Sequence, residues 1–331
     1  MGKNGIIFKN LLIVALTFGA GLWLARPLRK QVQRHFPECV MADDGEYQIR
    51  RIGGYQFVRP IFFSEPINES VALEPLKKNI ISALGKLNLG SDTEFSVYFR
   101  EFDKGRWICI HPELRFRPAS LLKMALIIDY FRQAQSDPSL MDRQMSLSPR
   151  DTLGQNRQFF SEQVVRFGQS YSVRRLLELM SRHSDNNASR LLASGLSPES
   201  QAQLFEQLGL PPINFSRNEY LLTAREASVF LKGIFNGTLL SPESSDQAAE
   251  LLSKGQFSEG FGASFPEDIP MWHKYGEWHD GLGMRELHET AVFFVGERAY
   301  LLTVMTRGRD SQQLAEILRT VARVAIKDIG A

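Results

Sequence analysis

Residues 118–134 read PASLLKMALIIDYFRQA. The spacing predicts a helix from Ser120 to Ala134 that is apolar on nearly every side, which is typical of a helix buried at the centre of a domain. Ser120 and Lys123 open this helix three positions apart, so their side chains share one face. Burial and the positive end of the helix dipole both favour a neutral lysine, which can accept a proton from a serine hydroxyl. The pair is compatible with a serine nucleophile, although an isolated S-x-x-K is better explained by a helix-capping serine and a surface lysine.

Two further short motifs follow along the chain. Residues 183–186 read HSDN and lie between two apolar helical runs, where a helix-capping loop is an equally good interpretation. Residues 274–276 read KYG and close a predicted strand. Each motif is weak alone. Their order, on a helix start, a loop and a strand in turn, makes the set of three a strong indication of one catalytic site.

Regular patterns begin at residue 73. Helical spacing is found in residues 73–87, 172–181, 224–234 and 310–326, and strand patterns in residues 95–100, 107–110, 271–274, 290–295 and 300–306. Strands therefore occur at both ends of this region, with a helical block between them. This arrangement predicts a mixed α/β (α+β) fold in which both chain ends build one antiparallel sheet flanked by helices, next to an all-helical lobe.

The N-terminus departs from the pattern of a soluble protein. Residues 11–25 carry no charge, and the apolar stretch extends back to about residue 6. No small-x-small cleavage pattern follows, so we expect an uncleaved membrane anchor helix within residues 1–30, crossing the membrane through residues 6–25. A buried core helix is the alternative. Residues 31–72 are too apolar for a free linker, and we expect them to form an extended arm that packs on the main domain, residues 73–331.

Composition excludes several classes of function. The chain has 331 residues and a formal net charge of +2, which gives no basic surface for nucleic acid. Its two cysteines cannot form a disulfide framework or a cysteine-rich metal site, and its six histidines lack the spacing of metal ligands. Phosphate-binding loops and the G-x-S-x-G motif are missing from the sequence. We expect no metal, no cofactor and no nucleic-acid partner.

The three motifs resemble the signatures S-x-x-K, S-D-N and K-T-G of the penicillin-recognising serine enzymes, the class A β-lactamases and penicillin-binding proteins. The resemblance runs from about residue 73 to residue 331. It implies a β-lactamase/transpeptidase-like fold with the active site between the α/β lobe and the helical lobe. It also implies that Ser120 is the acylated nucleophile, that Lys123 is its base or proton relay, and that Ser184 passes the proton toward the leaving nitrogen.

The same resemblance implies a set of substrate-binding residues. Asn186 would bind the acyl side chain of the substrate and steady Lys123. Lys274 would hold the substrate carboxylate, at a strand position bordered by Tyr275 and Gly276. The backbone N–H groups of Ser120 and Glu277 would form the oxyanion hole.

The chain departs from the family pattern at two points. Tyr275 stands where the family has threonine or serine, and we expect its ring to narrow the cleft. No Glu-x-x-x-Asn occurs between residues 186 and 223, where a β-lactamase carries the base for deacylation. The glutamates there, Glu199, Glu206 and Glu219, are interpreted as surface residues. Slow deacylation is therefore expected.

The resemblance implies a membrane-anchored serine hydrolase or acyltransferase that acts on a β-lactam or a peptidoglycan stem peptide. The family's substrates lie outside the cytoplasmic membrane, so we expect a single-pass protein with an extracytoplasmic catalytic domain. The basic residues after the apolar stretch favour the opposite orientation. A catalytically weak or inactive relative that serves as a cell-wall-binding or scaffolding module is the alternative, and β-lactamase, D,D-peptidase and esterase activities stay open.

Overall fold

A computed structural model describes residues 46–52, 60–148, 165–211 and 220–330 of the chain. These residues all belong to one compact unit, Asp44–Ala331. The predicted anchor, residues 6–25, lies outside the described residues. Among those that are described, none of the helices combines the length and the apolar character that a bilayer crossing requires.

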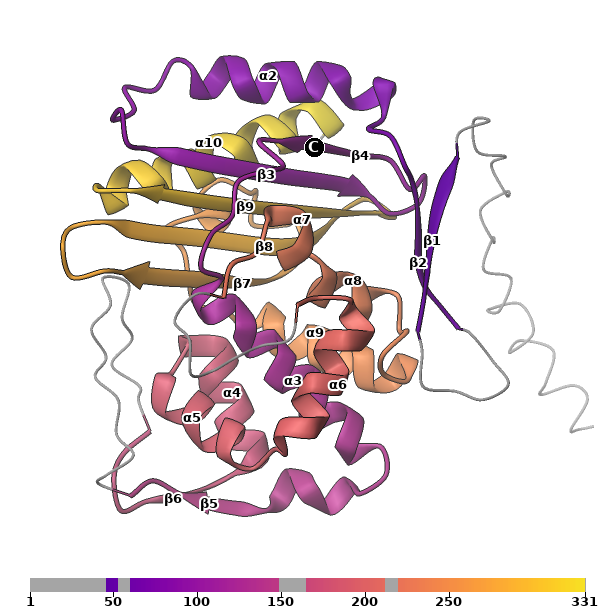
Figure 1. Cartoon of the computed structure of the whole chain (residues 1–331), viewed down its shortest axis with the longest axis vertical. Coiled ribbons are helices and arrows are strands. Elements are labelled where there is room, and N and C mark those ends of the chain that lie inside the picture. The colour runs from indigo at the N-terminus through magenta and orange to yellow at the C-terminus, as the bar shows by residue number, and fades with distance from the viewer. Residues whose placement is uncertain (1–45, 53–59, 149–164, 212–219, 331) are drawn as a thin grey trace, which may run out of the picture. The chain divides into compact units, whose positions relative to one another are not determined.

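A five-stranded antiparallel sheet with the order β4-β3-β9-β8-β7 organises this unit (Figure 1). Its strands are β3 (Glu94–Glu101), β4 (Trp107–Ile110), β7 (Met271–His279), β8 (Arg285–Val295) and β9 (Arg298–Gly308). Segments from both ends of the chain meet in it, because β3 pairs with β9, which confirms the predicted origin of the sheet. The strands β7, β8 and β9 are all longer than predicted. In β8 the added residues include Glu286, His288 and Glu289, which are buried in the structure.

Side chains from the two faces of the sheet belong to two separate hydrophobic cores. Along β3, Val97 and Phe99 belong to one core and Tyr98 to the other, as the alternation of side chains in a strand requires. The first core lies under α2 (Glu74–Leu84) and α10 (Ser311–Ile329), which cover one face of the sheet in Figure 1. The second core joins the other face to the helical lobe.

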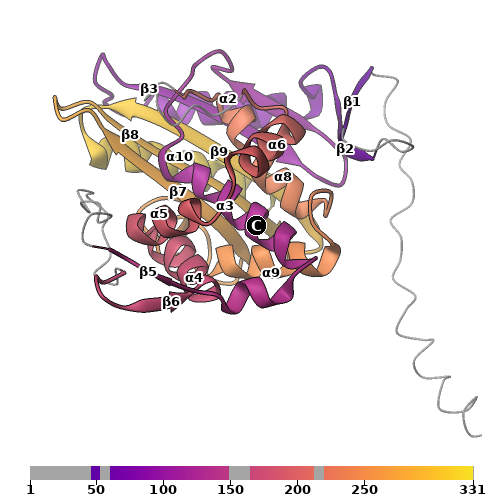
Figure 2. The same ribbon diagram turned by 60° about the horizontal axis from the view of Figure 1, so that its bottom comes forward.

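The helical lobe surrounds α3 (Lys123–Ala134), which follows the short 3₁₀ helix η2 (Ala119–Leu122). The other helices of the lobe are α4 (Val173–His183), α5 (Asn186–Ser194), α6 (Pro198–Leu208), α7 (Ala224–Ala227), α8 (Val229–Phe235) and α9 (Pro242–Ser253). Of the α3 residues, Met124, Ile127 and Ile128 are fully buried, as the predicted central helix requires. Figure 2 shows α4, α5 and α9 gathered around α3.

Shorter elements connect the main ones. They are the 3₁₀ helices η1 (Val71–Leu73), η3 (Pro138–Asp142) and η5 (Phe261–Ala263), and the strand pair β5 (Gln144–Ser146) and β6 (Ser170–Ser172). Polar caps define the starts of several helices: Ser172 opens α4, Asp185 opens α5 and Ser197 opens α6 through a side-chain hydrogen bond to a backbone N–H. The start of α4 agrees with the helical pattern predicted from residue 172.

The described part of the arm forms the antiparallel pair β1 (Tyr47–Arg51) and β2 (Ile61–Pro66). Strand β2 contacts the sheet and the helical lobe through Glu65, which is only 1% exposed. Its carboxylate accepts hydrogen bonds from Arg100 at 2.6 Å and Lys232 at 3.3 Å, and it also pairs with Arg225. The indole of Trp107 donates to the carbonyl of Pro66 at 2.8 Å. One buried carboxylate from the arm thus faces cations from the sheet and from two helices.

Candidate active site

The backbone places Ser120 at a tight turn between the sheet and α3. Ala119 adopts the left-handed conformation with φ of 49°, which costs a residue with a side chain on the order of 1 kcal/mol. Ser120 follows it inside η2, where its carbonyl accepts from the backbone N–H of Lys123. The two residues therefore occupy one helical turn at the start of α3, and both are largely buried, at 8% and 7% exposed.

The amine of Lys123 meets the loop between α4 and α5. It lies 2.6 Å from the Ser184 carbonyl, 2.8 Å from Asn186 Oδ1 and 3.2 Å from Ser184 Oγ. Ser184 is itself left-handed, with φ of 53° and ψ of 36°, and so ends α4 while turning its hydroxyl and carbonyl toward the lysine. The structure thus brings Lys123, Ser184 and Asn186 into direct contact.

Asp185 holds this loop rather than facing the lysine. It is fully buried, and its carboxylate accepts from the backbone N–H groups of Ala188 and Val165, each at 2.8 Å. One of these bonds caps α5 and the other ties the loop to a distant segment. The negative charge also lies at the positive end of the helix dipole, which stabilises both.

Strand β7 brings the third motif to the same turn. It is the edge strand of the sheet, and Gly276 lies so close to η2 that an added Cβ would be 2.8 Å from the Pro118 carbonyl oxygen. Glycine is required at this contact because any side chain would push the strand away from the turn that holds Ser120. Figures 1 and 2 both show the start of α3 next to β7. Glu277 follows on the same strand.

Lys274 and Tyr275 occupy positions inside the protein. The Lys274 amine donates to the Tyr275 carbonyl at 2.9 Å and is 4.4 Å from the centroid of the Tyr275 ring. The ring stacks on Phe257, with centroids 4.3 Å apart, and belongs to the core beneath α10. The expectation that Tyr275 narrows the cleft is therefore wrong, because alternation along β7 turns its ring into that core.

Of the glutamates considered for deacylation, those that the structure describes are surface residues. Glu199 and Glu206 are exposed on α6, as interpreted from the sequence, and Glu219 lies outside the described residues. Glu226 forms a capping box with Thr223 and an ion pair with Arg115 at 3.0 Å. Its carboxylate is thus engaged in holding the start of α7.

The sequence analysis did not identify two buried residues near the turn that holds Ser120, Glu286 and His288 on β8. Both are fully buried, and both bond to the main chain of Arg117, at 2.8 and 2.9 Å. The sequence signal for these residues was their spacing, because two polar residues at i and i+2 of a strand lie on one face of the sheet. The same spacing is typical of a strand face exposed to solvent, so it does not by itself indicate burial.

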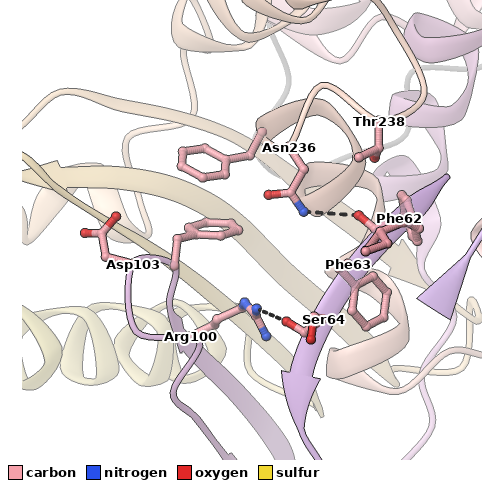
Figure 3. A pocket seen from close by; sticks show the side chains of 10 residues that line it. Phe62, Phe63, Ser64, Arg100, Asp103, Asn236 and Thr238 are labelled. Carbon is pink, nitrogen blue, oxygen red and sulfur yellow. Dashed lines mark hydrogen bonds between the residues drawn. The ribbon is translucent and has the colours of Figure 1, made fainter. Parts of the chain in front are cut away.

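A cavity of about 360 Å³ lies away from these residues, between β2, the end of β3 and the segment after α8 (Figure 3). Its lining includes Phe62, Arg100, Phe102 and Asn236. Asn236 donates to the Phe62 carbonyl at 3.4 Å, and Arg100 donates to the Ser64 carbonyl at 2.9 Å, as the dashed lines show. None of the predicted catalytic residues lines it.

Comparisons with known proteins give a family match and similar folds. A family model described as "Beta-lactamase enzyme family" matches residues 77–329. PBP-A superposes with a TM-score of 0.65 and 17% identity, covering 77% of this chain and 96% of that one. A class A β-lactamase from Mycobacterium abscessus gives a TM-score of 0.65 and 18% identity, covering 77% and 100% of the two chains. A β-lactamase from Xanthomonas campestris pv. campestris gives 0.64 and 19%, covering 78% and 98%. No curated protein matches the sequence.

Proposed function

The chain belongs to the beta-lactamase enzyme family and is a β-lactamase-like serine hydrolase, and from this premise we propose that Ser120 forms an acyl-enzyme with a β-lactam or a peptidoglycan-like amide. The observation that carries the proposal is the contact of Lys123 with Ser184 and Asn186 one helical turn from Ser120. A buried amine with neighbouring hydroxyls is the arrangement that activates a serine.

In the proposed mechanism Lys123 reacts as a neutral amine, which has two N–H donors and one lone pair. The Ser184 carbonyl and Asn186 Oδ1 are pure acceptors, so they would take the two N–H bonds. The lone pair would then accept a hydroxyl proton. In the proposed acylation, Lys123 takes the proton of Ser120 Oγ as that oxygen attacks the carbonyl carbon. Ser184 gives its hydroxyl proton to the leaving nitrogen as the C–N bond breaks, and the Lys123 ammonium, 3.2 Å away, replaces that proton on Ser184 Oγ.

Substrate binding is proposed for the β7 side of the site. Lys274 supplies positive charge for a substrate carboxylate, and the backbone N–H groups of Ser120 and Glu277 stabilise the oxyanion. Gly276 allows the strand to lie close enough for both N–H groups to serve one oxygen. A mutant of PBP-A, a similar structure, was solved as an acyl-enzyme complex with penicillin G, which supports penicillin as a probe.

The proposal includes slow deacylation. Glu226 is engaged with Thr223 and Arg115, and a positioned general base typically contributes roughly 10²–10⁴-fold to such a step. A penicillin should therefore give a stoichiometric burst of product followed by a long-lived adduct on Ser120. Intact-mass measurements over time test this, and fast steady-state hydrolysis without an adduct would contradict it.

The decisive variant is Ser120→Ala. Incubation with a fluorescent penicillin should label the wild type once per chain and leave the folded variant unlabelled. Labelling that persists in Ser120→Ala would assign the nucleophile to another residue. A wild type that binds but never becomes labelled would favour the non-catalytic, cell-wall-binding alternative.

We also propose that residues 6–25 anchor the protein in the cytoplasmic membrane with the catalytic domain outside. The proposal rests on the apolar sequence and on the extracytoplasmic substrate class. Protease added to cells with an opened wall should digest the domain while the membrane is intact. Protection until membrane lysis would reverse the orientation.

A further inference from the structure

Two buried residues of β8 form hydrogen bonds to the main chain just before the turn that holds Ser120. Glu286 accepts the backbone N–H of Arg117 at 2.8 Å, and His288 Nε2 lies 2.9 Å from the Arg117 carbonyl oxygen. Both side chains are completely buried and lie on one face of the strand. The two bonds hold two successive peptide groups, those before and after the Arg117 Cα.

The hydrogen-bond partners fix the form of the histidine. The backbone N–H of Thr306 donates to His288 Nδ1 at 3.2 Å, so Nδ1 is an acceptor and the ring proton is on Nε2. His288 therefore donates to the Arg117 carbonyl. The second oxygen of Glu286 accepts from Arg307 Nε at 2.8 Å, which fixes the orientation of that carboxylate.

The residues beside Arg117 are held as well. Arg307 donates to the Arg115 carbonyl at 2.7 Å, and Phe116 exchanges both backbone hydrogen bonds with Leu222, each at 2.9 Å. Two residues after this restrained segment, Ala119 takes the left-handed conformation. A strained backbone conformation persists only when its surroundings fix it, and here the fixing contacts lie immediately before it.

We propose that Glu286 and His288 are positioning residues for acylation, which act by holding both peptide groups of Arg117 so that the turn at Ala119 presents Ser120 to the substrate. Neither side chain is required to touch the substrate. The inference rests on the proposed function for its kinetic consequence, but its structural consequence at Ala119 stands independently. A displacement of about 1 Å at a reacting group can cost on the order of 10²-fold in rate, so a small relaxation of this turn has a large effect.

A matched pair of variants separates the effect of the His288–Arg117 hydrogen bond from the effect of the other contacts that His288 makes in the sheet. In His288→Asn, the amide oxygen replaces Nδ1 and keeps the bond to Thr306, but the side chain stops one atom short of the Arg117 carbonyl. In His288→Gln, the longer side chain places an amide N–H where Nε2 was. Both variants are neutral amides in the same buried position, and only one of them keeps the donor to Arg117.

Acylation by a fluorescent penicillin is followed at several concentrations to separate initial binding from the acylation rate constant. We expect His288→Asn to lower the rate constant on the order of 10- to 100-fold, with initial binding changed less than about twofold. His288→Gln should recover most of the wild-type rate. A merely structural role would lower the melting temperature of both variants without separating their rate constants.

Crystal structures of the two variants provide a readout that needs no acylation. Ala119 should leave the left-handed region in His288→Asn and stay there in His288→Gln. Equal rate constants, or an unmoved Ala119 in His288→Asn, would overturn the proposal. If the wild type itself is never acylated, the proposed function fails, and the position of Ala119 alone decides the inference. Should the asparagine variant not fold, Glu286→Gln, which removes one of the two acceptor oxygens, is measured for the same loss.

Discussion

At the scale of single residues, the candidate site depends on two backbone positions as much as on its proposed catalytic side chains. Ala119 accepts a left-handed φ of 49°, and Gly276 admits the Pro118 carbonyl into the space that a Cβ would fill. Strain and close approach of this kind are often found at functional sites, where the surrounding packing maintains them. The chemistry of Ser120 is thus inseparable from the geometry of its neighbours.

Gly276→Ala tests this dependence. The added methyl group would lie 2.8 Å from the Pro118 carbonyl oxygen, so β7 must move away from η2. We expect the acylation rate constant for a fluorescent penicillin to fall on the order of 10²-fold, because the strand and the turn carry the two proposed oxyanion donors. Gly262→Ala is the matched control, since its methyl would be 3.5 Å from the nearest atom, an ordinary contact. Similar rates in the two variants would refute the role of the close approach.

At the scale of elements, strand β2 of the arm is joined to the rest of the unit by one carboxylate. Burial alone would raise the pKa of Glu65, but the charges of Lys232, Arg100 and Arg225 outweigh burial and hold that pKa at about 2. Burial in turn lowers the pKa of Lys232 to about 7, although Glu65 opposes this. The cations lie on β3, α7 and α8, so Glu65 connects the arm to both lobes.

Glu65→Gln should therefore destabilise the fold by about 3–5 kcal/mol at pH 7, because it leaves buried cations without their counter-ion. Since folding lowers the pKa of Glu65 below the ordinary 4.5, its contribution is complete above that pH and is lost as the pH falls through 2. Urea denaturation of both proteins between pH 7 and pH 2 should show the difference shrinking. Glu69→Gln, which breaks a half-exposed pair with Lys77, is the control and should cost below about 1 kcal/mol. A difference that stays constant with pH would contradict the charge mechanism.

At the scale of the whole molecule, the compact unit begins earlier in the chain than the region that matches the family model. The model begins at residue 77, whereas Glu65 and the Pro66 carbonyl contribute buried contacts from before that point. Arg100, Lys232 and Arg225 face this carboxylate in the same unit. A segment outside the family match, which includes Glu65 and Pro66, therefore contributes buried contacts to the part of the chain that matches the family.

Two truncations test this completion. A chain that begins at Glu46 keeps β1 and β2, and we expect it to melt cooperatively and to be labelled by a fluorescent penicillin. A chain that begins at Asn68 lacks Glu65 and should lose at least the roughly 3–5 kcal/mol expected for the glutamine variant. Thermal melts and urea titrations of the two chains measure this directly. Equal stabilities would show that the arm is dispensable.

Much of the fold followed from the sequence by itself. The central helix after Ser120, the strands near residues 95–100 and 107–110, and the closing helix have periods and turn residues that act over a few positions. The three motifs identified the candidate site in the same way, because each is a short run on one element. What such patterns specify is local.

Tertiary structure alone decided which polar residues are buried and which way the side chains of β7 face. Glu65, Glu286 and His288 look like surface residues in the sequence, because a charged or polar side chain is buried only when its partners are present. Those partners are 33 to 167 residues away for Glu65, and 169 and 171 residues away for Glu286 and His288 at Arg117. The ring of Tyr275 likewise enters the core because Phe257 and α10 meet it there. The sequence alone determined the elements and their motifs, whereas contacts between distant segments determined the environment of each side chain.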